Sequence, residues 1–236
     1  MKKKRKREQF VSCIVAAAGK GERMGAGINK IFLDIDDQPV IAHTLLTLAE
    51  SEYIDELIIV TQEKDLLGCK DIVTEFGVAK VKSILIGGDK RQYSVQNALG
   101  EVSERADIVL VHDAARPLVS QETIRQVVET VIEYGAAAVG VSCKSTLKQL
   151  DSDGFITNTL DRDAIYEVQT PQGFRREIIQ KAYAEAFAAG VLGTDDCYLA
   201  ERIGTRIKMV DGSYDNIKIT TYDDLFVAEQ ILDRRK

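Results

Sequence analysis

The chain has 236 residues, of which 45% are hydrophobic and 29% charged, and its formal net charge is −6. This length allows one large α/β domain or two small ones, and no stretch approaches the ~20 apolar residues that a membrane span needs. The four cysteines are scattered without a Cys-x-x-Cys pair, and only two histidines are present. This composition argues against a zinc site and favours buried free thiols in a reducing compartment, the cytoplasm.

The chain begins with six consecutive basic residues at 2–7, followed by an apolar run over 10–18. This order resembles a secretory signal, but cleavage after the alanines would remove the first predicted strand. We therefore expect a disordered basic tail over 1–9 and a single domain over 10–236. Residues 9–236 hold 25 basic and 36 acidic residues, a net charge of −11. Such a negative charge on residues 9–236 disfavours nucleic-acid binding. If the domain binds a triphosphate, it must do so with a few cations that lie close together.

Apolar runs then alternate with helical periodicity along the first two thirds of the chain. Strands are predicted over 10–15, 56–61, 82–86, 108–112 and 136–142, and helices over 40–51, 64–76, 91–102 and 121–134. This alternation predicts an α/β fold, a doubly wound and mostly parallel Rossmann-like sheet with helices on both faces.

The alternation of strands and helices stops over 145–172, where two strand-like segments flank an Asp-Ser-Asp-Gly turn. This pattern predicts a projecting β-hairpin arm, whose apolar positions would complete their burial on a second copy of the chain. The C-terminal part predicts helices over 175–189, 195–203 and 222–234, with short strands near 206–210 and 216–219 and Thr221 as the cap of the last helix.

Residues 16–30 form a glycine-rich segment directly after the first strand, Ala-Ala-Ala-Gly-Lys-Gly-Glu-Arg-Met-Gly-Ala-Gly-Ile-Asn-Lys. Glycines let backbone N–H groups approach an anion, and two cations, Arg23 and Lys30, follow. The spacing of Gly19, Gly21 and Gly25 fits neither the dinucleotide fingerprint nor the Walker loop. The segment predicts a polyphosphate cradle, and the alternative is a tight turn without a ligand.

Further polar motifs follow later strands, at the edge where doubly wound sheets bind ligands. They occupy residues 87–94, 112–117 and 216–218. Each has a simpler interpretation: Gly87 and Gly88 as a turn, Ser94 as a helix cap, Asp113 and Arg116 as a local ion pair, or Lys218 as an exposed lysine. His112 is expected to be a packed histidine without a catalytic role. The shared location of these motifs favours a binding site.

In order along the chain, these motifs resemble those of the 2-C-methyl-D-erythritol 4-phosphate cytidylyltransferases, over about residues 11 to 233. The resemblance is carried by Ala-Ala-Gly-x-Gly-x-Arg-Met-Gly at 17–25, Gly-Gly-Asp-x-Arg-x-x-Ser-Val at 87–95, Val-His-Asp-Ala-Ala-Arg-Pro at 111–117, Asp161-Arg162, Gln-Thr-Pro-Gln-Gly-Phe at 169–174, Thr-Asp-Asp at 194–196 and Asn-Ile-Lys-Ile-Thr at 216–220. It implies attack of an alcohol's phosphate monoester on the α-phosphorus of CTP, which yields a cytidine diphospho-alcohol and pyrophosphate.

The resemblance also implies roles for individual residues. Catalysis would depend on Arg23, Lys30 and Lys218, and Mg²⁺ would sit near Asp113 and Asp215. The nucleotide would lie against Ala17, Ala18, Gly19, Gly21, Gly88, Asp89 and Ser94. The polyol phosphate would contact Asp113, Arg116, Thr146, Arg162, Thr170 and Thr194. Arg162 lies on the arm, so it would reach the substrate of the other subunit in a homodimer with composite sites.

Two positions depart from the family pattern. Asn29-Lys30-Ile31 stands where the family usually has Pro-Lys-Gln, and Ser145 stands where it usually has Asp. Three alternatives remain: transfer to ribitol 5-phosphate or another polyol phosphate, a sugar-1-phosphate nucleotidyltransferase that uses a different base, and a catalytically idle nucleotide-binding or scaffold protein. No nucleic-acid or membrane partner is expected.

Overall fold

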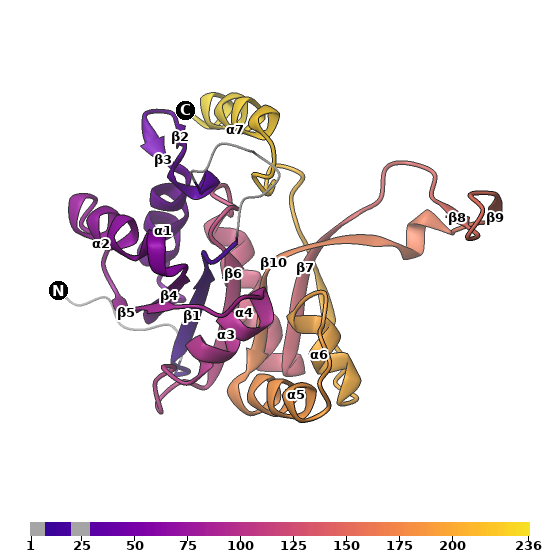
Figure 1. The fold of residues 1–236 in the computed structure, drawn as a ribbon, viewed down its shortest axis with the longest axis horizontal. Helices are drawn as coiled ribbons and strands as arrows, with labels where there is room; N and C mark the ends of the chain where they lie inside the picture. Colours follow the sequence, from indigo (N-terminus) through magenta and orange to yellow (C-terminus); the bar gives the residue numbers. More distant parts are fainter. Residues whose placement is uncertain (1–7, 20–28) are drawn as a thin grey trace.

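The computed structural model describes residues 8–19 and 29–236, so most of the predicted tail and the middle of the glycine-rich segment lie outside the described residues. Within them, a seven-stranded sheet has the order β11-β7-β10-β6-β1-β4-β5 (Figure 1). Its neighbours are parallel except where β10 runs antiparallel to β6 and β7. The strands are Val11–Ala16 (β1), Glu56–Thr61 (β4), Val81–Ile86 (β5), Ile108–Asp113 (β6), Ala136–Ser142 (β7), Tyr166–Arg175 (β10) and Lys208–Asp211 (β11).

Helices cover both faces of this sheet, which confirms the predicted doubly wound α/β fold. One face packs against α1 (Val40–Glu50), α2 (Leu66–Glu75), α4 (Gln121–Tyr134) and α7 (Tyr222–Arg235). The other face packs against α3 (Arg91–Leu99), α5 (Arg176–Ala188) and α6 (Asp196–Arg202). None of the helices in the described part of the chain is long and apolar enough to cross a bilayer.

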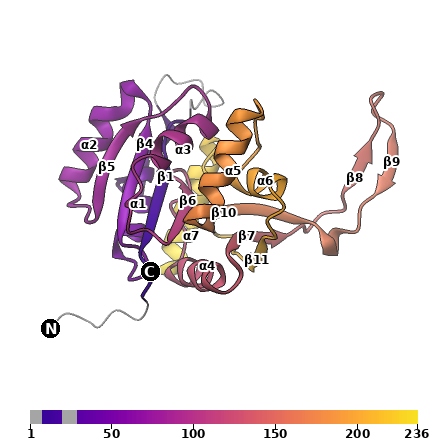
Figure 2. The same ribbon diagram turned by 90° about the horizontal axis from the view of Figure 1, so that it is seen from below.

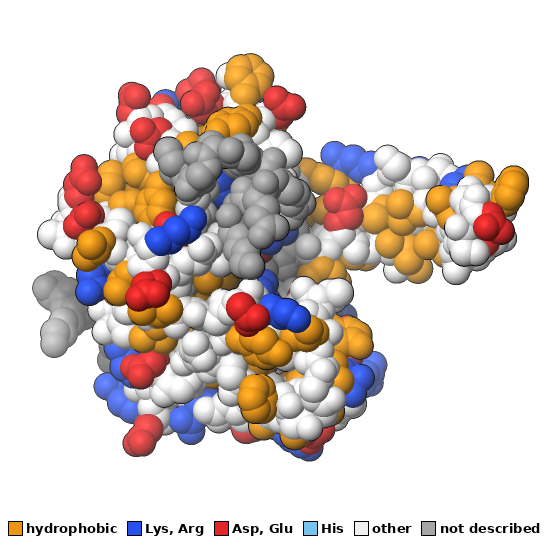
Figure 3. All heavy atoms as spheres, viewed as in Figure 1, with side chains coloured by type: hydrophobic (Ala, Val, Ile, Leu, Met, Phe, Trp, Pro, Cys, Tyr) orange, Lys and Arg blue, Asp and Glu red, His pale blue; other side chains and the backbone are white. Residues whose placement is uncertain are grey.

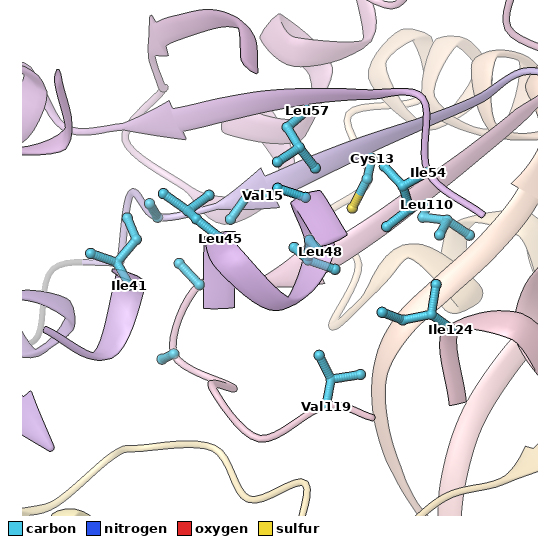
Figure 4. Close-up of a cluster of buried hydrophobic side chains, with 14 of the residues drawn as sticks. Cys13, Val15, Ile41, Leu45, Leu48, Ile54, Leu57, Leu110, Val119 and Ile124 are labelled. Carbon is cyan, nitrogen blue, oxygen red and sulfur yellow. The ribbon is translucent and has the colours of Figure 1, made fainter. Parts of the chain in front are cut away.

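The two faces of β1 show how the apolar run builds both halves of the core. Cys13 and Val15 belong to the first cluster, whereas Ile14 belongs to the second, and all three are fully buried. Helix α1 brings Leu45 and Leu48 against the first cluster (Figure 4). Burying such a side chain contributes roughly 1.5–3 kcal/mol, so the strand that leads into the glycine-rich segment is anchored on both sides.

Four short elements complete this part of the fold. The 3₁₀ turn η2 (Lys30–Phe32) follows the glycine-rich segment and leads into the paired strands β2 (Asp34–Ile35) and β3 (Gln38–Pro39), and a second 3₁₀ turn, η3 (Glu63–Asp65), precedes α2. The sequence did not predict η2, β2 and β3, because elements of two or three residues leave no periodic pattern, and it predicted η3 only as the start of the helix over 64–76.

One local prediction is wrong. Residues 216–219 do not form a strand: the N–H of Ile219 donates to the carbonyl of Ala115 at 2.8 Å, and the segment is a loop in which Asn216 and Ile219 are buried and Lys218 is partly exposed. The predicted start of the helix at residue 91 is confirmed, since α3 begins at Arg91 with Lys90 as its cap residue, and the simpler interpretation of Ser94 as a helix cap does not hold. The cap of α7 is as predicted, since Thr221 and Asp224 form a capping box.

The segment predicted as a hairpin arm does project from the body of the molecule (Figures 1 and 2). Its tip pairs β8 (Lys148–Leu150) with β9 (Ile156–Thr159) in antiparallel orientation, and the 3₁₀ turn η4 (Arg162–Ala164) leads back into β10. Leu150, Phe155 and Ile156 are 55–71% exposed there, and Figure 3 shows hydrophobic side chains along the arm.

Candidate active site

A cavity of about 310 Å³ opens at the carboxyl ends of β1 and β6, the edge at which doubly wound sheets bind their ligands. Its size falls at the lower end of the range for small-molecule sites. The described residues that line it are Ala16, Ala17, Ala18, Gly19, Asn29, Lys30, Ile31, Arg91, Ser94, Asp113, Ala115, Lys218 and Thr220. Seven of the predicted site residues are therefore brought together here.

The two ends of the glycine-rich segment form one wall of this cavity. Ala17 continues β1, and its N–H donates to the carbonyl of Val60 at 2.8 Å. Lys30 begins η2, with Asn29 as the cap residue. Of the residues that the resemblance assigns to this segment, Gly21 and Arg23 lie outside the described residues, and their roles stay predictions.

Asp113, the last residue of β6, is surrounded by three cations. Its carboxylate lies 2.6 Å from Lys218 Nζ, 3.3 Å from Arg91 Nε and 4.0 Å from Arg116 Nε. Burial would raise the pKa of Asp113, but the charges of Arg91, Lys218 and Arg116 outweigh it and hold that pKa well below its ordinary value. Asp113 is therefore a permanent negative charge that gathers cations at the cavity.

Arg91 connects Asp113 to helix α6, on the face of the sheet that α3, α5 and α6 cover. Its Nη2 donates at 2.8 Å to Asp196, whose side chain is fully buried and also accepts a hydrogen bond from the hydroxyl of Tyr183. Burial would lower the pKa of Arg91, but Asp196 and Asp113 raise it. Two carboxylates thus meet three cations, which gives the network a net charge of +1, and Lys30 adds a further positive charge to the cavity.

Arg116 lies just behind the cavity. Its Nη1 donates to the carbonyl of Asn216 at 2.7 Å, and its side chain is 12% exposed. The amide of Asn216 in turn donates to the carbonyl of Thr170 at 3.0 Å. These bonds fix the loop that carries Lys218, which explains how an irregular segment can place a lysine on Asp113.

Hydrogen bonds that involve Thr170 and His112 fix the backbone of Asp113. Thr170 Oγ1 accepts from the N–H of Asp113 at 3.0 Å, so its own proton is available for His112 Nδ1 at 3.1 Å. His112 Nε2 then carries the remaining proton and donates to the carbonyl of Arg116 at 3.1 Å. Burial lowers the pKa of His112 from 6.5 to about 4. His112 is thus a neutral, packed histidine, as the sequence predicted, and it helps to position Asp113.

Three of the residues predicted to contact the nucleotide, Gly88, Asp89 and Ser94, lie in the turn between β5 and α3 and in the first part of α3. Ser94 Oγ donates to the carbonyl of Lys90 at 3.1 Å and lies 3.3 Å from the carbonyl of Gly88. A Cβ on Gly87 would come within 2.4 Å of Ser94 Oγ, so this position requires glycine. Gly88 and the exposed Asp89 follow in the same turn but are not among the described residues that line the cavity.

The remaining predicted residues lie apart from the cavity. Thr146 and Arg162 are exposed on the arm, and Thr194 is exposed just before α6. Asp215, expected beside Mg²⁺, pairs instead with Arg234 at 2.6 Å and with Arg235 at 3.6 Å, both at the end of α7. In the described part of the chain, no group of three or more His, Cys, Asp or Glu side chains is arranged to hold a metal.

Comparison with known proteins assigns the chain to a family. The family model for 2-C-methyl-D-erythritol 4-phosphate cytidylyltransferase matches residues 11–234. The chain belongs to this family. Curated members from Caldanaerobacter subterraneus and Clostridium acetobutylicum are each 44% identical to it, over 94% and 93% of this chain and 98% and 96% of theirs. A solved 4-diphosphocytidyl-2C-methyl-D-erythritol synthase from Anaerococcus prevotii has a TM-score of 0.86 at 30% identity, covering 96% of this chain and 97% of that one.

Two residues that line the cavity, Arg91 and Asn29, were not predicted to have a role there. Arg91 stands inside the quoted motif at 87–95 but received no role, because its partner Asp196 is 105 residues away. Asn29 was noted only as a departure from the family pattern. The signal that could have found Arg91 is its position in the first turn of a helix beside a glycine pair, where a cation faces the sheet edge.

Proposed function

We propose that the chain transfers the cytidylyl group of CTP to 2-C-methyl-D-erythritol 4-phosphate, a step of non-mevalonate isoprenoid precursor synthesis. Its family membership and its identity to relatives of that name support the reaction. A phosphate oxygen of the alcohol phosphate forms the new bond to the α-phosphorus of CTP. The bond from that phosphorus to the β-phosphate oxygen breaks, and pyrophosphate leaves.

The observation that carries this proposal is the convergence of Lys30, Lys218 and Arg91 at one cavity around Asp113. A phosphate dianion is already a nucleophile, so the reaction needs no general base. What it needs is charge that brings two anions together in line and stabilises the equatorial oxygens of the transition state. Among its described residues, the cavity lining contains neither histidine nor cysteine, which is compatible with such chemistry.

The backbone of Ala17, Ala18 and Gly19, with Ser94 opposite, forms the part of the cavity that we assign to the cytidine. Ala17 is 2% exposed and Ser94 is 1% exposed, so both are packed into the wall of this part of the cavity. The small side chains of this wall leave room for a base next to the backbone. We assign the triphosphate to Lys30 and Lys218, and Arg23, which lies outside the described residues, remains a predicted third cation.

Mg²⁺ is the expected metal, and the donor set fits it in one respect. Magnesium keeps several waters and commonly binds through one or two carboxylates plus substrate phosphates. Asp113, whose pKa is held well below its ordinary value, is such a carboxylate and lines the cavity, whereas Asp215 is not among the described lining residues and pairs with two arginines at the end of α7. We therefore assign Asp113 alone to the metal, which when bound would neutralise phosphate charge. Lys218 would then be shared between Asp113 and the phosphates.

We further propose that the arm completes the site of a second subunit. Its exposed Leu150, Phe155 and Ile156 would gain burial on another copy of the chain. Arg162, whose side chain is 58% exposed at the base of the tip, and Thr146 would then contact the alcohol phosphate across the interface. All four cysteines are buried free thiols, which supports our assignment of the enzyme to the reducing cytoplasm.

Lysine variants test this proposal. Lys30→Ala and Lys218→Ala should each lower kcat for pyrophosphate release by about 100- to 1,000-fold, the usual loss when one preorganised charge is removed. Lys82→Ala is the matched control, because that exposed lysine bonds the carbonyl of Glu101 away from the cavity. Unchanged kcat in both cavity variants, with Mg²⁺ and CTP saturating, would contradict the proposal.

A further inference from the structure

The connection that follows β4 contacts both ends of the glycine-rich segment. Gln62 donates from Nε2 to the carbonyl of Ala18 at 3.2 Å and to the carbonyl of Gly19 at 3.0 Å. Three residues later, Asp65 accepts from Asn29 at 2.8 Å. Gln62 is thus hydrogen-bonded to the start of the glycine-rich segment, after β1, and Asp65 is hydrogen-bonded to its end, beside Lys30.

Asn29 is buried and uses both halves of its amide. It is 3% exposed, and its Oδ1 accepts from the N–H of Ile31, which caps η2. Its Nδ2 donates to Asp65 and, at 3.4 Å, to the carbonyl of Ala17. One side chain therefore joins the turn that presents Lys30, the wall assigned to the base and the start of α2.

Asp65 gives this junction a firm base. It is 8% exposed and stands immediately before α2, where a carboxylate is favoured by the helix dipole. Helix α2 packs into the first core cluster through Cys69 and Ile72. Displacement of the Lys30 turn would thus have to break a buried hydrogen bond to a helix that is itself anchored in the core.

From this geometry we propose that Asn29 is a positioning residue that acts through Lys30, with Asp65 as its anchor. Gln62 is a second positioning residue, which holds the backbone of Ala18 and Gly19 in the cavity wall through its bonds to their carbonyls. The inference rests on the proposed function, because it is the triphosphate of CTP that Lys30 would meet. A displacement of about 1 Å in a charge-positioning group can cost about 100-fold in rate. Asn29, next to Lys30 in the chain, would therefore affect the rate of the reaction through the position of the Lys30 ammonium.

Asparagine is suited to this place for a chemical reason. Only an amide can accept from Ile31 and donate to Asp65 and Ala17 at once. Alanine would remove every one of these bonds. Aspartate would keep the acceptor but would set a second carboxylate against Asp65, whose Oδ2 lies 2.8 Å from the present donor.

The first experiment is a cycle between Asn29 and Lys30, with steady-state pyrophosphate release as the readout. Asn29→Ala should lower kcat by about 10- to 100-fold. In the Asn29→Ala/Lys30→Ala double variant, the loss should equal that of Lys30→Ala alone, because a residue that acts through Lys30 has no effect once the ammonium is absent. Multiplying losses would show an independent role and would overturn the inference.

A swap tests the anchor separately. Asn29→Asp should lose at least tenfold in kcat, and adding Asp65→Asn should restore part of it, since the bond between positions 29 and 65 then forms with the amide donor on the other side, whereas the bond to the carbonyl of Ala17 stays lost. A merely structural effect would change the thermal midpoint of unfolding but not kcat of the folded enzyme measured well below it. Failure of the swap to restore kcat in a folded protein would overturn the role of Asp65.

Gln62 keeps the inference testable if the buried variants do not fold. Gln62→Ala should raise KM for CTP by about 2- to 10-fold, as expected for one lost hydrogen bond. Gln121→Ala is its matched control, because Gln121 also donates to a backbone carbonyl, that of Thr47, outside the cavity. Equal KM values in the two variants would overturn the role of Gln62.

The proposed function and the positioning role would fail in different ways. If Lys30→Ala itself leaves kcat and KM unchanged, the proposed function of the cavity is wrong. If Lys30→Ala is damaging while Asn29→Ala and Gln62→Ala are both as active as the wild type, only the positioning role is wrong.

Discussion

Lowering the pH from 7 to 4 would protonate His112 in the unfolded chain well before it does so in the folded enzyme. The side chain is fully buried, and burial lowers its pKa from 6.5 to about 4. The charges that face it are Asp113 on its own strand, which favours protonation, and Arg116 and Lys218, which oppose it. A proton on Nδ1 would also break the bond that Thr170 donates.

The sign and size follow from proton linkage. Between about pH 6.5 and 4 the unfolded state binds more protons than the native state, so stability falls as the pH falls. Above that window both states are neutral at this residue, and it contributes nothing. A lowering from 6.5 to about 4 corresponds to about 3 kcal/mol of unfolding free energy lost across the window.

Urea unfolding at several pH values measures this loss directly. A His112→Gln variant should lack that part of the pH dependence, whereas His43→Gln should retain it, because His43 is only partly buried. The chain has two histidines, so their imidazole signals can also be followed separately by NMR. Equal pH slopes in wild type and His112→Gln, or a native His112 that titrates near pH 6.5, would refute the reasoning.

Three further predictions concern the site and the arm. Arg91→Ala leaves Asp196 buried without its cation, so the free energy of unfolding should fall by about 3–5 kcal/mol; a loss below 1 kcal/mol in urea unfolding would contradict the network. Gly87→Ala should raise the Kd for CTP measured by calorimetry about tenfold, because a Cβ there would meet Ser94 Oγ at 2.4 Å and force the turn to move; an unchanged Kd would argue against a nucleotide at this turn. Mixed Arg162→Ala and Lys30→Ala subunits should regain part of the activity that each lacks alone, if sites are shared between chains; no gain, with subunit exchange verified, would rule out the composite site.

The sequence predicted the elements that are long and uniformly buried. The bounds of β4, β7 and α4 were predicted to the residue, since apolar runs and an amphipathic helix leave clear periods. The strand predicted over 216–219 is wrong, although Ile219 is fully buried there. Its N–H donates to the carbonyl of Ala115 within a loop, and the segment does not pair with a strand of the sheet. A buried apolar residue therefore does not by itself distinguish a strand from a loop.

The sequence predicted that Lys30, Lys218 and Asp113 belong to one site, and all three line the cavity; their action on a ligand stays a prediction. The contacts that hold the residues of the cavity in place were not predicted. The partnerships of Arg91 with Asp196 and of Asn29 with Asp65 span 105 and 36 residues. Such pairs depend on which strands become neighbours, and only the folded sheet brings them together.

The most direct test of the central claim is pyrophosphate release by the wild-type enzyme with CTP and Mg²⁺, comparing 2-C-methyl-D-erythritol 4-phosphate with ribitol 5-phosphate at matched concentrations. We expect a large preference in kcat/KM for the methylerythritol phosphate. A preference for ribitol 5-phosphate, or no release with either alcohol phosphate, would contradict it.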